Sequence, residues 1–242
     1  MNPLLVITST VYVNSQLTVL TDPGVRLSQY TESILFYIKS VQFAEIVICD
    51  NSGFDYSTVD VIQTTAKASN VKLEFLFFTG NTEQIQKQGK GYGEGEILHH
   101  IMQFSQLMRK TSAFMKVTGR INVLNIGALI KAANPETNYF QRIGLNPIRN
   151  RKMVDTRLYY CQKDDFINSL IRSYTKVNDF NGHYLERAYY EALNGRVRYR
   201  NFLILPRFQG ISGSHGGSLT DVAALFYFKS YINYLFIKLH LV

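Results

Sequence analysis

The residues with the greatest capacity for chemistry stand in four short segments, each of which follows an apolar run of the 242-residue chain. The first carries hydroxyls, the second an acid and an amide, the third alternating glycines with a lysine, and the fourth a lysine and an arginine. If the apolar runs are parallel strands, their carboxyl ends meet at one edge of a sheet, where ligands bind in open α/β proteins. The sequence therefore predicts one composite site from residues 8–15, 50–53, 89–96 and 116–120.

The residue types in these segments suit a phosphorylated ligand. Arg120 offers a planar fork for two-point contact with a phosphate, and Lys116 a compact charge, although both could belong to a solvated strand end. Asp50 is placed to accept hydrogen bonds from a ribose or a base, and a turn-capping role is the alternative. The candidate ligand-binding residues are Thr8, Ser9, Thr10, Asp50, Asn51, Lys90, Gly91, Gly93, Lys116, Gly119 and Arg120.

The glycine-rich stretch 89–95 has two interpretations. Alternating glycines let the backbone approach a ligand closely, and the helix predicted after them would offer free N–H groups to an anion. The stretch lacks the Gly-Lys-Ser/Thr ending of a Walker loop and follows the third strand, so neither that motif nor the dinucleotide-binding fingerprint applies. A plain mobile loop is the alternative.

Hydrophobic periodicity predicts the elements that position these segments. In the first half it indicates strands at 4–9, 44–50, 71–78 and 113–117, separated by helices at 26–41, 59–69 and 97–108. This alternating order predicts a parallel α/β sheet with right-handed crossovers. In the second half it indicates helices at 125–133, 164–174 and 183–193, strands at 154–162 and 202–206, and a flexible loop at 209–218.

Composition bounds the class of protein. Hydrophobic residues make up 46% and charged residues 18%, which suits a sizeable core in a single domain. The two cysteines, Cys49 and Cys161, lack the paired spacing of a disulfide scaffold or zinc cluster. The sequence shows neither a signal-peptide pattern nor an uncharged apolar run of about 18 residues. We therefore expect one cytoplasmic domain, with a ligand-binding half (1–125), a second half (126–218) and an aromatic helix (219–242).

The charge distribution suggests an anionic partner. Basic residues outnumber acidic ones by 26 to 18, a net charge of +8. Residues 1–121 are neutral (10 − 10 = 0), so all of the excess lies in 122–242. Nucleic acid, a phosphorylated ligand or an acidic membrane would each fit. Single-stranded nucleic acid binding is one alternative, because the basic stretches 142–152 and 196–207 have aromatic residues close by.

The order of the four segments resembles the nucleotide-sugar half of GT-A glycosyltransferases over roughly residues 1–125, and more loosely to residue 210. In that family the fourth strand usually ends in Asp-x-Asp, which holds a divalent metal against the donor diphosphate. Residues 114–120 read Phe-Met-Lys-Val-Thr-Gly-Arg instead. This Lys-x-Thr-Gly-Arg pattern looks like that of bacterial polysaccharide and lipopolysaccharide glycosyltransferases. The resemblance implies a GT-A-like fold, a nucleotide-sugar donor and a glycan or lipid-linked saccharide acceptor.

The missing acidic pair bears on the metal and on activity. Lys116 and Arg120 could neutralise the leaving phosphate in place of a metal. We therefore predict no required cofactor, with Mn²⁺ or Mg²⁺ as the alternative, and no nucleic-acid partner. A catalytically inactive subunit of a polysaccharide assembly complex is a further alternative.

The sequence leaves open whether transfer inverts or retains the sugar configuration. Transfer with inversion needs a general base on the acceptor hydroxyl, and the resemblance implies a carboxylate near the start of a second-half helix. Glu186 fits that position, with His183 as the runner-up. Glu186 could instead be a surface carboxylate paired with Arg187 or Arg200. Asp179 is the third choice of base, and Asp155 is a candidate for catalysis or metal binding. The other candidates are Arg157 and Tyr184 for the acceptor, and His215 for the donor phosphate if its loop closes as a lid.

The tail, residues 221–242, is rich in aromatic residues and carries two lysines. One interpretation is a terminal helix docked on the domain. The other is an interfacial helix, with aromatics at headgroup level and lysines on anionic lipid. The second interpretation would make the protein peripheral on the inner face of the plasma membrane.

Overall fold

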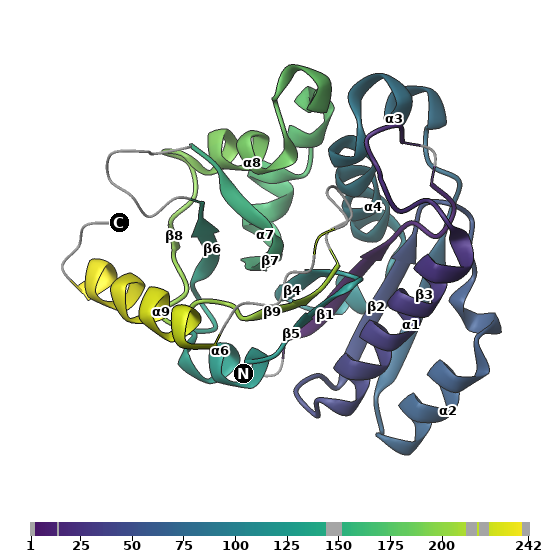
Figure 1. Cartoon of the computed structure of the whole chain (residues 1–242), viewed down its shortest axis with the longest axis horizontal. Coiled ribbons are helices and arrows are strands. Elements are labelled where there is room, and N and C mark those ends of the chain that lie inside the picture. The colour runs from purple at the N-terminus through teal and green to yellow at the C-terminus, as the bar shows by residue number, and fades with distance from the viewer. Residues whose placement is uncertain (1–2, 14, 144–151, 212–216, 218–222, 239–242) are drawn as a thin grey trace.

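The computed structural model describes residues 3–13, 15–143, 152–211, 217 and 223–238. Figure 1 shows a sheet flanked by helices, with the C-terminal helix at one edge of the molecule. The strands are β1 (Leu4–Ser9), β2 (Glu45–Asp50), β3 (Lys72–Phe77), β4 (Ala113–Thr118), β5 (Ile121–Val123), β6 (Asn138–Arg142), β7 (Val154–Gln162), β8 (Tyr199–Arg200) and β9 (Phe208–Gly210). The helices are α1 (Pro23–Lys39), α2 (Asp60–Ala68), α3 (Thr82–Gln88), α4 (Lys90–Phe104), α5 (Gln106–Lys110), α6 (Ile126–Ala132), α7 (Lys163–Asp165), α8 (Leu185–Leu193) and α9 (Ala223–Lys238). In the described part of the chain, no helix is long and apolar enough to cross a membrane.

The main sheet has seven strands in the order β3-β2-β1-β4-β7-β6-β8. The first four are parallel, β7 runs antiparallel to β4 and β6, and β6 is parallel to β8. The predicted α/β class, with a mostly parallel sheet and a mixed second half, is confirmed. Thr8 lies opposite both Cys49 and Thr118, so β1, β2 and β4 reach the same edge at the same level.

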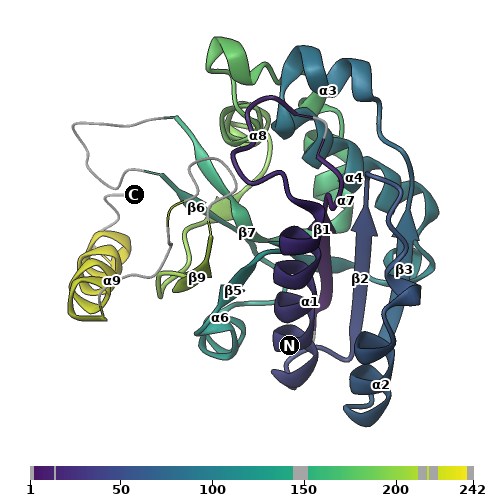
Figure 2. The ribbon, with the colours of Figure 1, turned by 45° about the vertical axis from the view of Figure 1, so that its right-hand side comes forward.

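Both faces of the sheet are covered, which explains why β1 and β2 are apolar almost throughout. Because side chains alternate along a strand, Leu5 and Ile7 pack with α1 and α2, whereas Leu4 and Val6 pack with α4 and α8. Figure 2 shows this layering from the side of α1. The carboxyl edge of the parallel strands is therefore held between two separate cores.

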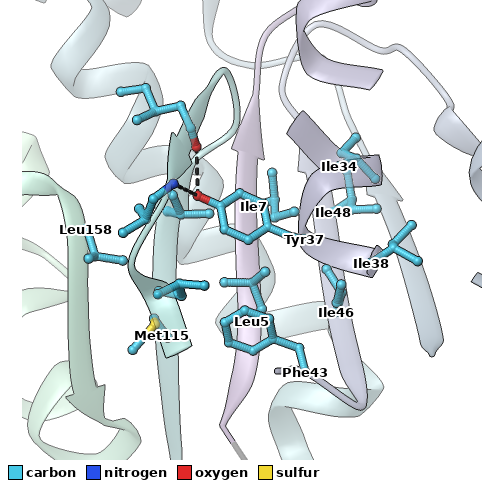
Figure 3. Close-up of a cluster of buried hydrophobic side chains, with 14 of the residues drawn as sticks. Leu5, Ile7, Ile34, Tyr37, Ile38, Phe43, Ile46, Ile48, Met115 and Leu158 are labelled. Atoms are coloured by element: carbon cyan, nitrogen blue, oxygen red, sulfur yellow. Dashed lines mark hydrogen bonds between the residues drawn. The ribbon is translucent and has the colours of Figure 1, made fainter. Parts of the chain in front are cut away.

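Tyr37 links the first core to the β4–β5 connection. Tyr37 belongs to α1, and its side chain is fully buried. Its hydroxyl donates to the carbonyl of Ile121 (2.7 Å) and accepts from the amide of Val123 (3.0 Å). Figure 3 shows both hydrogen bonds above a layer of aliphatic side chains. Burial raises the pKa of this phenol far above its ordinary value, so the hydroxyl stays protonated and keeps both bonds.

Two predictions for the second half were wrong. Residues 202–206 form no strand, because side-chain amides rather than a neighbouring strand satisfy the backbone there: Asn233 donates to the carbonyl of Phe202 (2.9 Å) and Asn125 to that of Leu205 (2.9 Å). The helix expected at 164–174 is interrupted by a π-helical turn, Phe166–Leu170, and a 3₁₀ turn, Ser173–Lys176. At the break, the Ser173 hydroxyl donates to the carbonyl of Leu170 (2.6 Å) and competes with the helical pattern.

The glycine-rich segment was also predicted wrongly, since it is not a loop. Residues 90–95 form the first turns of α4, and Gly91, Gly93 and Gly95 are all buried. A Cβ on Gly95 would overlap the Cβ of Tyr174, and one on Gly93 would lie 3.0 Å from Nδ2 of Asn51. These glycines therefore allow close packing of a helix rather than backbone freedom.

This packing predicts the effect of Gly95→Ala. Alanine normally favours a helix interior over glycine by about 1 kcal/mol, but here the new methyl group would overpack the contact with Tyr174. Overpacking costs about 1–3 kcal/mol and the gain in helix propensity offsets about 1 kcal/mol of it, so we expect a net loss of up to about 2 kcal/mol in the free energy of unfolding, measured by urea denaturation. Gln103→Ala, at an exposed position of the same helix, is the control; an equal gain in both variants would contradict the packing role.

Candidate active site

A cavity of about 670 Å³ opens at the carboxyl edge of the sheet. Its walls come from the segment after β1, α1, the start of α4, the β4–β5 turn, β7 and α8. The structure thus brings together parts of all four segments that the sequence singled out. The predicted residues that line it are Thr8, Ser9, Thr10, Asn51, Lys90, Gly91, Gly93, Arg120, Arg157, Asp179, Tyr184 and Glu186. Asp50, Lys116, Gly119, Asp155 and His183 are not in its lining, and His215 lies outside the described residues.

Asp50 is fully buried beneath the cavity and does not reach a ligand. Its carboxylate accepts hydrogen bonds from the Ser9 hydroxyl (2.9 Å), the Val11 amide (3.0 Å) and the Ser52 amide (2.7 Å). The turn-capping alternative therefore describes it, since it ties the segments after β1 and β2 together. The neighbouring Asn51 lines the cavity in its place.

Lys116 is also wholly buried, contrary to its predicted role at a ligand phosphate. Its ammonium forms an ion pair with Glu94 on α4 and donates to the carbonyl of Thr156 on β7 (2.7 Å) and to Oγ1 of Thr118 (3.0 Å). The side chain faces the α4 side of the sheet because it has the same strand parity as Phe114. Glu94, which the sequence analysis did not single out as a candidate, lines the cavity. Its negative charge is balanced by the buried ammonium of Lys116.

Glu186 lies at the first turn of α8 and faces the cavity. Burial raises the pKa of its carboxyl above the ordinary value of 4.5, and the negative charges of Glu94 and Asp155 raise it further. Thr156 Oγ1 lies 3.4 Å from its Oε1. A half-buried carboxylate with a raised pKa has the properties of a general acid or base.

The other predicted catalytic groups are engaged elsewhere. His183 places Nε2 3.1 Å from a carboxylate oxygen of Glu191, outside the cavity lining. Asp155 forms a two-point ion pair with Arg157, with contacts of 2.6 to 3.1 Å. The guanidinium of Arg157 also lies over the ring of Phe208, 4.2 Å from its centroid, while the residue lines the cavity.

The carboxylate of Asp179 lies at the start of α4, where the sequence analysis expected an anionic ligand to bind. Its carboxylate accepts the amide of Gly91 (3.0 Å), and burial raises its pKa despite that bond and the nearby charge of Lys90. The helix N-terminus is thus capped by the protein itself. The amide of Gly91, which was expected to be free for an anionic ligand, is therefore already occupied.

The opposite wall holds a cluster of hydrogen-bond donors around Tyr30. The guanidinium carbons of Arg26 and Arg120 each lie 5.6 Å from the centroid of the Tyr30 ring. The Tyr30 hydroxyl accepts from the Thr10 amide and from Nη2 of Arg26, both at 3.1 Å. It therefore has its own proton left to donate, and no described residue accepts that proton.

Neither arginine of this cluster forms an ion pair with any described residue. Arg120 donates from Nη1 to Oε1 of Gln29 (3.1 Å), while its buried Nε meets no acceptor among the described residues. Burial lowers the pKa of Arg26, the Tyr30 hydroxyl opposes that shift, and the positive charge of Arg120 adds to it. Two uncompensated cations and a free hydroxyl proton make this wall suited to an anion.

Gly119 sets the place of Arg120 without lining the cavity. Its amide donates to the carbonyl of Thr8 (3.0 Å), and a Cβ there would lie 2.6 Å from that oxygen. Only glycine allows this approach of the β4–β5 turn to β1. Close packing of the backbone therefore explains why the Lys-x-Thr-Gly-Arg pattern has a glycine at this position.

The residues at the end of β4 do not fit a divalent cation. Where an acidic pair would be needed, Lys116 places an ammonium, and the nearby carboxylate of Glu94 is engaged by it. Within the described ranges, no group of three or more His, Cys, Asp or Glu residues is placed to hold a metal ion. We derive no step through a metal.

Comparison with known proteins gave little. No protein-family model and no curated protein matches the chain. Among solved structures, the crystal structure of HddC from Yersinia pseudotuberculosis aligns with a TM-score of 0.34 and 12% identity, over 69% of this chain and 80% of that chain. We therefore build the functional proposal on the geometry of the cavity.

The Lys116–Glu94 pair predicts unequal effects of its two single substitutions. Glu94→Gln leaves a fully buried ammonium without its carboxylate, so we expect a loss of about 3–5 kcal/mol in the free energy of unfolding. Lys116→Met leaves a carboxylate that is 25% exposed and partly reached by water, so its loss should be smaller. The double variant should recover most of the loss in urea denaturation; additive losses would contradict the pairing.

Proposed function

We propose that the protein is a glycosyltransferase that moves a sugar from a nucleotide-sugar donor to a glycan or lipid-linked saccharide acceptor, in the synthesis of a surface polysaccharide. One observation carries this proposal: a single cavity has a cationic wall with free hydrogen-bond donors and, from an element on the other face of the sheet, a half-buried carboxylate with a raised pKa. Transfer with inversion from a phosphate leaving group to a hydroxyl uses both kinds of group.

The cationic wall is assigned to the donor diphosphate. Negative charge builds up on the phosphate oxygen as its bond to the sugar breaks, and fixed donors near that oxygen stabilise the transition state. Arg120 and the Tyr30 hydroxyl supply hydrogen bonds, and Arg26 supplies charge from a buried position. These three groups take the part that the sequence assigned to Lys116 and Arg120.

Glu186 is assigned as the base. It takes the proton of an acceptor hydroxyl while the hydroxyl oxygen bonds to the anomeric carbon. The bond from that carbon to the phosphate oxygen breaks, and its electron pair leaves with the nucleoside diphosphate. Tyr184, exposed at the cavity, offers an aromatic face to the acceptor sugar, and Arg157 offers a charge-assisted donor.

Nucleotide binding is the first test. We expect one of UDP, GDP, CMP or dTDP to raise the melting temperature by about 5–10 °C at a hundred times its Kd. The shift should persist in EDTA and disappear in Arg120→Gln, but not in Arg196→Gln, an exposed control of the same charge. If none of the nucleotides raises the melting temperature, the proposal is wrong. If the shift requires Mn²⁺, the claim that the arginine wall binds phosphate without a metal is wrong.

Glu186→Gln should separate binding from chemistry. This variant keeps the shape of the side chain but removes the base, so the nucleotide shift should remain while kcat for sugar transfer falls by at least about 100-fold. Glu191→Gln, on the same helix but outside the cavity lining, is the matched control. Normal turnover by Glu186→Gln would exclude Glu186 as the base.

The pH profile follows from the raised pKa of Glu186. The base must be deprotonated, so kcat/KM should rise with pH through that pKa and reach half of its plateau above pH 4.5. Glu94→Gln removes a neighbouring negative charge and should move this acidic limb to lower pH. A limb that stays in place in Glu94→Gln would contradict the coupling between the two carboxylates.

A further inference from the structure

The three hydrogens of the Lys116 ammonium are all used inside the protein. An ammonium donates three hydrogen bonds and accepts none. Here they go to the carbonyl of Thr156 (2.7 Å), to Oγ1 of Thr118 (3.0 Å) and to the carboxylate of Glu94. Lys116 therefore has no hydrogen left for a ligand. It does fix the hydrogen-bonding roles of two side chains that line the cavity, Thr118 and Glu94.

The hydroxyl of Thr118 is left as a donor toward the cavity. Because the ammonium of Lys116 cannot accept a hydrogen bond, Oγ1 of Thr118 must accept the one between them. The proton of that hydroxyl is then available to a ligand, and no described residue accepts it. The Lys-x-Thr spacing produces this arrangement, since residues two apart on a strand lie on the same face of the sheet.

Glu94 offers the opposite role beside it. Its Oε1 is bound by Lys116, its Oε2 accepts no hydrogen bond from a described residue, and the side chain is 25% exposed. A carboxylate only accepts hydrogen bonds. Because Glu94 and Thr118 share one ammonium, an acceptor and a donor lie close together at the cavity. A pair of neighbouring sugar hydroxyls matches them, with one hydroxyl donating to Glu94 and the next accepting from Thr118.

The other cations that line the cavity outside the arginine wall already face carboxylates. Arg157 forms its two-point ion pair with Asp155, and Lys90 interacts electrostatically with Asp179 and Glu186. The arginines without carboxylate partners among the described residues belong to the α1 side, and α4 and α8 lie on the far side of the sheet from α1 (Figure 2). The α4–α8 side is therefore suited to the uncharged part of a ligand.

We propose that Glu94 and Thr118 bind the transferred sugar and select a neutral hexose or N-acetylhexosamine over a sugar acid. This inference rests on the proposed function, in which the anomeric carbon lies between the donor phosphate and the acceptor hydroxyl held by Glu186. Thr118 is two residues from Arg120 of the phosphate wall, and Glu94 interacts electrostatically with Glu186, so the pair lies along that path. A sugar carboxylate there would meet two negative charges, which disfavours it.

Calorimetric titration of the full-length chain without acceptor tests the selection. The probes are UDP, then UDP-glucose, UDP-galactose and UDP-N-acetylglucosamine, then UDP-glucuronate and UDP-galacturonate. If GDP or dTDP is the nucleotide that binds, GDP-mannose with GDP-mannuronate, or dTDP-glucose with dTDP-glucuronate, replaces them. At least one neutral form should bind about tenfold tighter than its nucleotide alone, and at least about tenfold tighter than its acidic counterpart.

Thr118→Val and Thr118→Ser separate sugar binding from a structural role. Valine removes the hydroxyl at nearly constant shape, so the affinity gained from the neutral sugar should fall about 3- to 10-fold, while the Kd of the nucleotide alone stays the same. Serine keeps the hydroxyl and should restore the gain. Valine also leaves a hydrogen of Lys116 without its acceptor and lowers the melting temperature, but the ratio of the two Kd values within one variant is insensitive to that loss. Thr64→Val, at an exposed position of α2, is the control.

Glu94→Gln/Lys116→Met tests the charge. This double variant removes the buried ion pair as a unit, so the fold should be kept and the preference for the neutral over the acidic form should narrow by at least about fivefold.

The outcomes distinguish this inference from the proposed function. If no nucleotide binds, both fail. If a nucleotide binds but no neutral sugar adds affinity, or if a sugar acid (CMP-linked sialic acid included) binds tighter than its nucleotide alone, only the present inference is wrong. A sugar-dependent gain that is unchanged in Thr118→Val would likewise reduce Thr118 to a structural partner of Lys116.

Discussion

The ammonium of Lys116 is buried at the end of β4, and the arrangement of the site depends on its neutralisation. A buried unpaired charge is costly, so Glu94 must lie close to it, which requires α4 to pack tightly against its surroundings. The glycines of α4 allow that packing. The carbonyl of Thr156 completes the ammonium's contacts, and the hydroxyl of the same residue lies beside Glu186. One ion pair thus connects β4, α4, β7 and α8.

The two sides of the cavity carry opposite charges, with carboxylates on one side of the sheet edge and arginines on the other. On the α4–α8 side, Glu94 and Glu186 face the cavity, and their mutual repulsion favours the protonated form of Glu186. On the α1 side, Arg26 and Arg120 lie next to each other without carboxylate partners among the described residues. The excess positive charge of the second half is not what makes the site cationic, because both arginines belong to the neutral first half.

Periodicity predicted the first four strands and their parallel arrangement, because buried parallel strands are long apolar runs. The position of Arg120 at the end of the fourth strand placed it at the cavity, and Glu186, chosen from the family resemblance, also lines it. Periodicity failed for residues 90–95, since glycine spacing looks the same for a loop and for a helix packed closely against its neighbours. Arg26 and Tyr30 were missed although a signal was present: an arginine one turn before a tyrosine on the apolar stripe of a helix lies on the face that packs against the sheet. Glu94 was missed because only the fold brings it to Lys116.

Besides carrying charge, Arg26 has a structural role. Its Nε and Nη2 donate to the carbonyl of Thr10 and its Nη1 donates to that of Leu20 (2.6 to 2.9 Å), so one side chain fastens both ends of the segment that walls the cavity after β1. The conformational entropy of ordering this segment is therefore lost during folding and not when a ligand arrives. For a ligand of this cavity, the two anchored ends add no further ordering cost on binding, which leaves more of the contact energy for affinity.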